Sequence, residues 1–154
     1  IYDRLVGSEM CIRDRYTNCI QEEHFFTDFV TASLVKYSIN SFLASKVIFF
    51  NQLNDIFKKS GAEDNWENFI NLVSKDARIG NSHMQVPGHD GRKGYGGACF
   101  PKDSAALLKF SKNLEVEFSL LKESININNE IRSVYNEPTE REFEQNISFK
   151  KDCD

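Results

Sequence analysis

A cysteine stands where several features favour its activation, in the stretch GYGGACFPKD at residues 94–103. Pro101 is well placed in the first turn of a helix, so we expect Cys99 two or three residues before a helix N-terminus. The free amides and the dipole there, together with the Lys102 ammonium, favour a thiolate, the nucleophilic form of cysteine. Asp103 lies four residues after Cys99 and can take a proton from water or cap the helix. From the residues alone, an inert, buried cysteine is the favoured interpretation, and a reactive nucleophile is the alternative that these features support.

The same stretch holds three glycines, Gly94, Gly96 and Gly97. Glycine allows positive φ and lets the backbone come close to a ligand. We therefore expect this turn to touch whatever reacts with Cys99.

A second group lies far earlier in the chain, where Lys36 and Asn40 stand four residues apart among apolar neighbours. That spacing puts both side chains on one face of a helix. On spacing alone, a surface lysine beside an incidental asparagine is the favoured interpretation, and a partly buried lysine that stabilises an oxyanion is the alternative.

Basic residues also collect in the loop before Cys99. They could bind a substrate phosphate or simply keep the loop solvated, and solvation is slightly favoured. These residues are His83, His89, Arg92 and Lys93.

A long helix is expected to carry Lys36 and Asn40. Residues 27–59 contain neither proline nor glycine, and apolar residues recur every three or four positions. Thr27 is the expected N-cap, and Gly61 the expected stop. Because the segment is apolar on more than one face, we expect it to pack against more than one body and to favour self-association.

Shorter helices should follow the long one. A helix starting at Asp64, with Glu67 completing a capping box, precedes helices over residues 101–113 and 116–134. Residues 76–99 form a long glycine-rich loop, a kind of segment that is usually functional or disordered. The polar tail, residues 136–154, is expected to fray. With no convincing strand, the fold class predicted is all-α.

Composition narrows the possible partners. A net charge of -4 argues against nucleic acid, and no apolar run approaches the roughly 20 residues of a membrane span. The spacing of the cysteines fits neither a zinc site nor a disulfide framework, so we expect no metal, reduced thiols and a cytoplasmic location. The cysteines are Cys11, Cys19, Cys99 and Cys153.

Residues 1–15 have no structural periodicity, and LVGSEMCIRD at residues 5–14 matches the translation of a transposase-type sequencing adapter. We therefore set residues 1–15 aside as non-native and expect the natural chain to continue upstream. A natural disordered leader is the alternative.

Three motifs resemble the UDP-glucose/GDP-mannose dehydrogenase family. GYGGACFPKD resembles its catalytic-cysteine motif, LVKYSINSFLASKVIFFNQLNDI its long central helix, and DARIG the segment before its active-site loop. They occur in the family's order over residues 26–135. The resemblance implies that residues 16–135 are the helical central domain, which forms the dimer, and that residues 136–154 are a polar tail.

The resemblance also implies roles for single residues. Cys99 matches the nucleophile, Asp103 the aspartate that helps to activate water, and Lys36 and Asn40 the pair that stabilises oxyanions or positions water. Arg78 matches an arginine that reaches the partner subunit's substrate. The turn that contacts the sugar corresponds to Gly94, Tyr95, Gly96 and Gly97, and Lys102 is assigned to cofactor binding.

The implied reaction is oxidation of the C6 alcohol of UDP-glucose to UDP-glucuronate, through a thiohemiacetal and a thioester on Cys99, with NAD as the oxidant. A homodimer through the long helix is expected, with no nucleic acid and no membrane. The sequence departs from the family in lacking the G-x-G-x-x-G of a Rossmann domain, so it is interpreted as a fragment that is inactive alone.

Two rivals remain. One is a non-catalytic helical dimerisation module of the same family. The other is an unrelated thiol enzyme, which would need a histidine partner, and no spacing singles out His24, His83 or His89.

Overall fold

A computed structural model describes residues 27–149, and within that range the chain is all-helical with no strand. The fold class predicted from the sequence is therefore confirmed. The described residues divide into two units between Ala32 and Ser33. The predictions for residues 1–15, Cys11, Cys19, His24 and Cys153 lie outside the described range.

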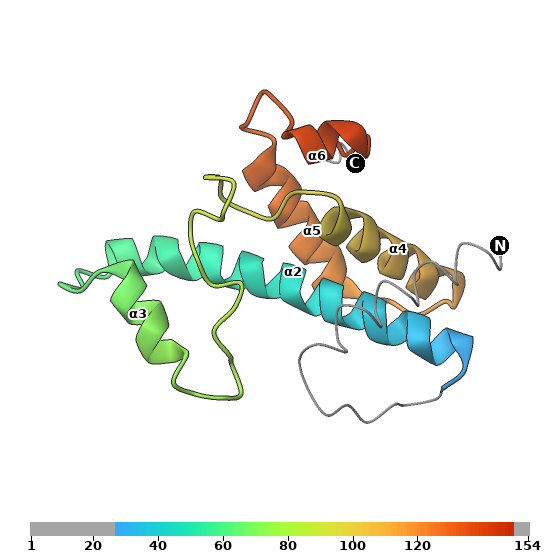
Figure 1. Cartoon of the computed structure of the whole chain (residues 1–154), viewed down its shortest axis with the longest axis horizontal. Helices are drawn as coiled ribbons and strands as arrows, with labels where there is room; N and C mark the ends of the chain where they lie inside the picture. The colour runs from blue at the N-terminus through green and yellow to red at the C-terminus, as the bar shows by residue number, and fades with distance from the viewer. Residues whose placement is uncertain (1–26, 150–154) are drawn as a thin grey trace, which may run out of the picture. The chain divides into compact units, whose positions relative to one another are not determined.

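The longest element is α2, Phe29–Lys59, which runs across the ribbon from blue to green (Figure 1). Its N-cap is Asp28 rather than the expected Thr27. The Asp28 carboxylate accepts hydrogen bonds from the amides of Val30 and Thr31, because a carboxylate reaches the first free N–H groups of a helix. The helix ends before Gly61, whose φ of +77° is the left-handed conformation that stops a helix.

One hydrophobic core joins the C-terminal half of α2 to α3, Trp66–Val73. Phe50 and Ile70 are buried there together with Met84 and Val86 from the following loop. The Asn65 side chain caps α3 by accepting the Asn68 amide at 2.8 Å, so the helix begins two residues after the expected start.

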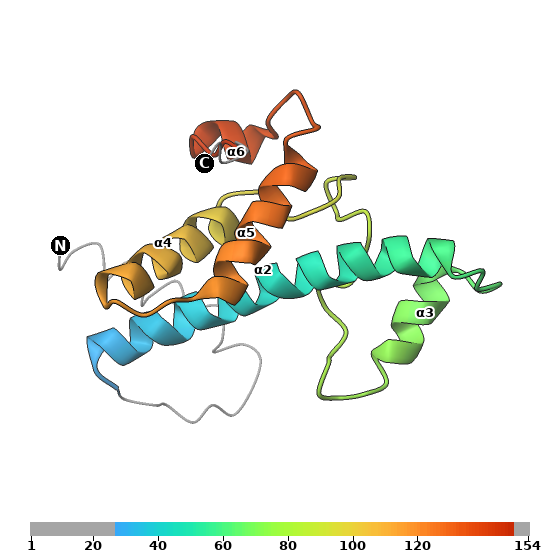
Figure 2. The ribbon, with the colours of Figure 1, turned by 180° about the vertical axis from the view of Figure 1, so that it is seen from behind.

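A second core lies at the middle of α2, where α4, Cys99–Asn113, and α5, Ser119–Arg132, approach it (Figure 2). Ala44, Ile48 and Tyr95 are buried at its centre. Burial of each large apolar side chain contributes about 2 kcal/mol. Since α2 contributes to both cores, it packs against more than one body, as its sequence predicts.

Much of the apolar surface of α2 nevertheless faces solvent. Among its side chains, Phe42 is 69% exposed and Phe49 61%. None of the helices in the described range is long and apolar enough to cross a bilayer.

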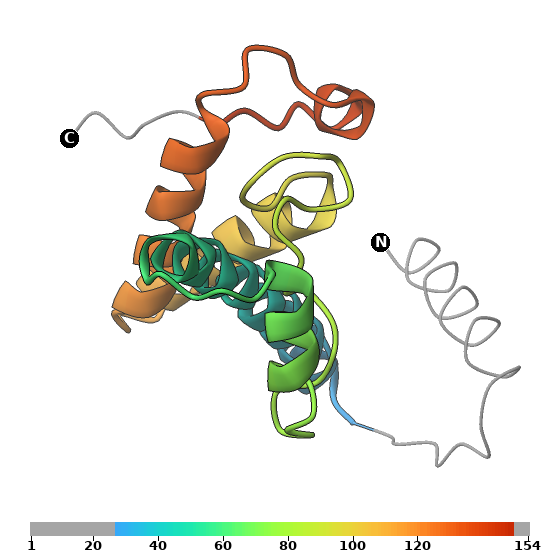
Figure 3. The same cartoon turned by 90° about the vertical axis from the view of Figure 1, so that its left-hand side faces the viewer.

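The prediction that the tail frays is wrong for its first part, because residues Glu140–Glu144 form α6. Glu142 is only 1% exposed and pairs with Arg132 at the end of α5. This buried ion pair fixes a segment whose composition looks like a solvated tail. Figure 3 shows α6 and α3 on opposite sides of α2.

Candidate functional site

A cleft of about 800 Å³ opens beside the glycine turn. The turn forms one wall through Gly94, Tyr95, Gly96 and Gly97, which are the residues predicted to touch substrate. The loop before it and the segment at residues 139–141 form the other walls.

Cys99 begins the helix that follows the turn. It is an exposed, free thiol and the first residue of α4, not two or three residues ahead of it, because the helix starts earlier than Pro101 predicts. No side chain caps this N-terminus at Ala98, so no side-chain oxygen occupies the amides that face the start of the helix. Asp103 lies one helical turn further on and is only 2% exposed.

The structure brings together two of the predicted catalytic residues that are 63 positions apart in the sequence. The Asn40 amide nitrogen on α2 donates a hydrogen bond to Asp103 Oδ2 on α4 at 2.6 Å. Lys36 lies one turn before Asn40 on α2 and is exposed, with its ammonium 5.7 Å from the centre of the Tyr37 ring. Lys36 and Asn40 lie on one face of α2, as their spacing predicts, but Lys36 is exposed rather than partly buried, which matches the alternative of a surface lysine.

Two buried asparagines hold the backbone of the turn. Asn128 on α5 accepts the Tyr95 amide at 2.7 Å and donates to the Tyr95 carbonyl at 3.0 Å. Asn51 on α2 accepts the Gly94 amide at 3.0 Å. A side chain at Gly94 would meet Asn128 Oδ1 at 2.7 Å, so only glycine fits this close approach.

Tyr95 is the side chain that anchors this turn in the second core. It is 4% exposed, and its ring meets Phe100 edge-on at 6.1 Å. Burial raises the pKa of its phenol to about 12, with the nearby Ser104 hydroxyl acting in the opposite direction. The group therefore stays neutral and serves as a packing element at ordinary pH.

A buried ion cluster supports the other side of the turn. Arg132 pairs with Glu142 and, at 2.7 Å, with Asp90 of the loop. Burial acts to raise the pKa of Glu142, but hydrogen bonding to the Thr139 amide and the charge of Arg132 outweigh it and hold that pKa below its ordinary value. The carboxylate is therefore ionised in the folded chain.

The basic residues of the loop fall into two groups. Arg92 donates to the Glu137 carbonyl at 2.7 Å, and the Lys93 ammonium pairs with Asp55, so both hold the loop in place rather than facing solvent freely. His83 and His89 line the cleft. Partial burial, followed by the charges of Lys46 and His89, lowers the pKa of His83.

Of the predicted site residues, only the four of the glycine turn line the cleft; its lining does not include Cys99, Asp103, Lys36, Asn40, Arg78 or Lys102. Arg78 is exposed, pairs with Asp76 at 2.6 Å, and lines a separate, mostly apolar groove of about 670 Å³ along α2 and α5. Lys102 is exposed on the first turn of α4. Within residues 27–149, no three metal-ligating side chains meet in one place.

The sequence analysis missed the residues that support the turn. For Asn51, Asn128 and Arg132 the signal was their position on helix faces that also carry core residues, since a polar side chain there must find a buried partner. The missed residues are Asn51, Asp90, Asn128, Arg132 and Glu142.

Known proteins share this chain's central region. The sequence model of the UDP-glucose/GDP-mannose dehydrogenase family, central domain, matches residues 30–130. A UDP-glucose 6-dehydrogenase of Bacillus subtilis, YwqF, is 37% identical over 139 residues, which cover 84% of this chain and 30% of that protein. The UDP-glucose 6-dehydrogenases of Rickettsia typhi and Rhizobium meliloti are each 36% identical, over 79% and 75% of this chain and 27% and 24% of their own lengths. The chain thus spans less than a third of these relatives.

Proposed function

Since the chain belongs to the UDP-glucose/GDP-mannose dehydrogenase family, we propose that it is the central part of an NAD-dependent UDP-glucose 6-dehydrogenase. Such an enzyme oxidises the C6 alcohol of UDP-glucose to the carboxylate of UDP-glucuronate. The observation that carries the proposal is the 2.6 Å hydrogen bond between Asn40 and Asp103. It joins the long-helix motif to the cysteine motif one turn from an exposed Cys99.

The proposed chemistry uses Cys99 as the nucleophile. Once the alcohol is at the aldehyde level, the thiolate adds to C6, and the carbonyl π electrons move to the oxygen to give a thiohemiacetal. The Lys36 ammonium and the Asn40 amide stabilise that oxyanion. After the second oxidation gives a thioester, water attacks the same carbon, Asp103 accepts its proton, and the Cys99 thiolate leaves.

The two oxidations release two hydrides, for which NAD is the proposed acceptor. Residues 27–149 do not fit a dinucleotide on their own, because they contain no strand and hence no βαβ unit to hold a pyrophosphate. Lys102 is proposed to contact the cofactor from the first turn of α4. Dinucleotide binding is therefore assigned to the part of the relatives that this chain does not span.

A homodimer through α2, in the cytoplasm, completes the proposal. Ile39, Phe42 and Phe49 expose more than half of their surface on this helix, which a second copy would cover. Arg78 lines the apolar groove on the same side as Phe42 and Phe49, and in the dimer it would reach the partner's nucleotide sugar. The same exposed face favours the alternative function, a non-catalytic dimerisation module.

Two experiments test the proposal. In the first, iodoacetamide labels Cys99 at about pH 7, and UDP-glucose should slow the labelling. In the second, residues 27–149, which include Arg132 and Glu142, replace the matching segment of the Bacillus subtilis relative, and NADH formation from UDP-glucose is measured. The chimera should be active and its Cys99→Ala variant inactive. An inactive but folded and dimeric chimera, with no protection of Cys99, would favour the dimerisation module.

A further inference from the structure

We propose that residues 139–142 complete the substrate cleft and that Glu142 is the positioning residue of the glycine turn ahead of Cys99. The proposal rests on the proposed function, which makes this turn part of the substrate site. It concerns a segment that lies outside residues 30–130, the range matched by the family.

A single carboxylate joins four parts of the site. Glu142 Oε1 accepts the Gly97 amide at 3.3 Å and pairs with Arg132 at the end of α5. Its Oε2 accepts the Thr139 amide at 2.7 Å and lies 3.9 Å from Arg92 Nη1. Because Glu142 is 1% exposed, solvent does not replace these partners when one is lost.

The turn is packed directly against this ion pair. A Cβ on Gly96 would lie 2.2 Å from both Arg132 Nη2 and Glu142 Oε1, closer than any real contact. The turn therefore has no room to move toward α6. Gly97 is two residues before Cys99, so the Glu142–Gly97 contact lies directly ahead of the N-terminus of α4.

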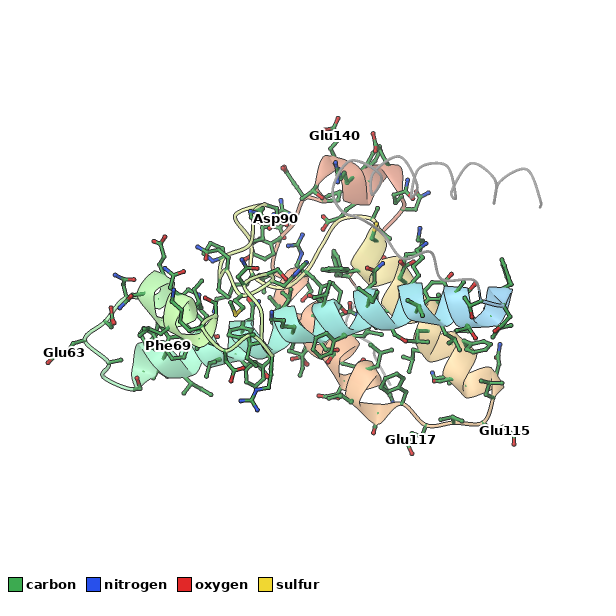
Figure 4. The ribbon with its side chains drawn as sticks, turned by 60° about the horizontal axis from the view of Figure 1, so that its bottom comes forward. Glu63, Phe69, Asp90, Glu115, Glu117 and Glu140 are labelled. Carbon is green, nitrogen blue, oxygen red and sulfur yellow. The ribbon has the colours of Figure 1, made fainter. Side chains whose placement is uncertain are left out.

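The same cluster fixes two walls of the cleft. Arg132 holds Asp90 of the loop, while Glu142 holds Thr139, which lines the cleft together with Glu140 and Arg141. Figure 4 shows Asp90 on the loop and Glu140 projecting outward from α6. One cluster thus ties the loop, the turn and the C-terminal segment into one cleft.

The test compares Glu142→Ala and Glu142→Gln with two controls. Glu144→Gln changes an exposed carboxylate on the same helix, and Leu121→Ala removes a buried side chain of α5 that is not part of the core around Tyr95. Two quantities are measured under conditions where each variant is folded. They are the amide hydrogen exchange of Gly97 and the UDP-glucose concentration that halves the labelling rate of Cys99.

Glu142→Ala should speed Gly97 exchange and raise the protecting concentration of UDP-glucose, each by about tenfold or more. Glu142→Gln keeps an acceptor for the Gly97 amide, so it should show smaller changes in both quantities. This variant also provides the test if Glu142→Ala does not fold. Both controls should match the parent. Unchanged Gly97 exchange in both Glu142 variants, or equal changes in Leu121→Ala, would overturn the proposal. If UDP-glucose slows Cys99 labelling neither in the parent nor in any variant, the proposed function fails. Gly97 exchange then still decides the role of Glu142.

Discussion

Replacing Gly96 by alanine should destabilise the chain for a steric reason that can be worked out from its neighbours. The new Cβ would lie 2.2 Å from Arg132 Nη2, 2.2 Å from Glu142 Oε1 and 2.8 Å from Arg132 Cζ. Relief therefore requires both side chains to move by about 1 Å, the gap to ordinary van der Waals distance. Their side chains are 1% and 2% exposed, so neither can swing into solvent.

The loss in the free energy of unfolding depends on how the neighbouring side chains respond to the new Cβ. If the neighbours shift and keep the ion pair, overpacking costs about 1–3 kcal/mol. If the pair separates, a buried charge loses its partner, and the loss rises to about 3–5 kcal/mol. We expect about 3 kcal/mol, measured as the change in the free energy of unfolding in urea at constant m-value.

Gly97→Ala is the matched control. It alters the neighbouring glycine, but its cost comes from the backbone conformation and not from a clash with the ion pair. Gly97 has φ of +73° and no atom within 4 Å of a built Cβ, so its cost is conformational, about 1–2 kcal/mol. Gly96→Ala should also speed the amide hydrogen exchange of residue 97, and by more than the backbone strain in Gly97→Ala does. If Gly96→Ala costs no more than Gly97→Ala, the ion pair is not a rigid support, and the reasoning is refuted.

Three further predictions concern the contacts around the turn. Asn128→Ala removes both hydrogen bonds to Tyr95 and should cost about 2–4 kcal/mol in urea unfolding, whereas Asn129→Ala, on the next residue, should cost under about 0.5 kcal/mol. Because the folded pKa of Glu142 lies below its ordinary value of 4.5, its carboxylate stabilises the fold above that value, and this contribution is lost as pH falls through the folded pKa. A pH series of melting temperatures should show this acid loss in the parent and a flatter profile in Glu142→Gln, and equal slopes would contradict it. Asn40→Ala leaves the buried Asp103 carboxylate without its amide donor and should cost about 1–3 kcal/mol, measured by thermal unfolding, while a neutral result would show that water replaces the donor.

The helices could be predicted from the sequence because their signals are local. The absence of proline and glycine over α2, the Gly61 stop and the Pro101 signal in the first turn of α4 each depend on a few neighbouring residues. The observed helix starts differ from the predicted ones where a side chain caps the helix. This occurs at Asp28 and Asn65, whose side-chain oxygens accept backbone amides two or three residues later. The α6 helix was missed although Thr139 and Glu142 have the spacing of a capping box.

The sequence predicted the glycine turn of the site but not the buried polar side chains that hold it, and α5 shows the physical reason. A hydrophobic stripe drawn through its sequence includes Leu120, which is 70% exposed. The buried face instead carries Leu121 with Asn128 and Arg132, both at most 2% exposed. Hydrophobicity ranks these two as surface residues, since only the folded chain reveals that the turn supplies Tyr95 amide and carbonyl groups and that α6 supplies a carboxylate.

The polar face of α5 is what a backbone-lined site requires. A glycine turn that must present its atoms to a ligand cannot satisfy its N–H groups within a helix or sheet, so side chains from elsewhere must do so. Here Asn51, Asn128 and Glu142 take the amides of Gly94, Tyr95 and Gly97. The motif at residues 94–103 is local in sequence, but its shape is held by partners as many as 45 residues away. A buried polar residue that faces a glycine turn is therefore the feature to look for in other chains with this motif.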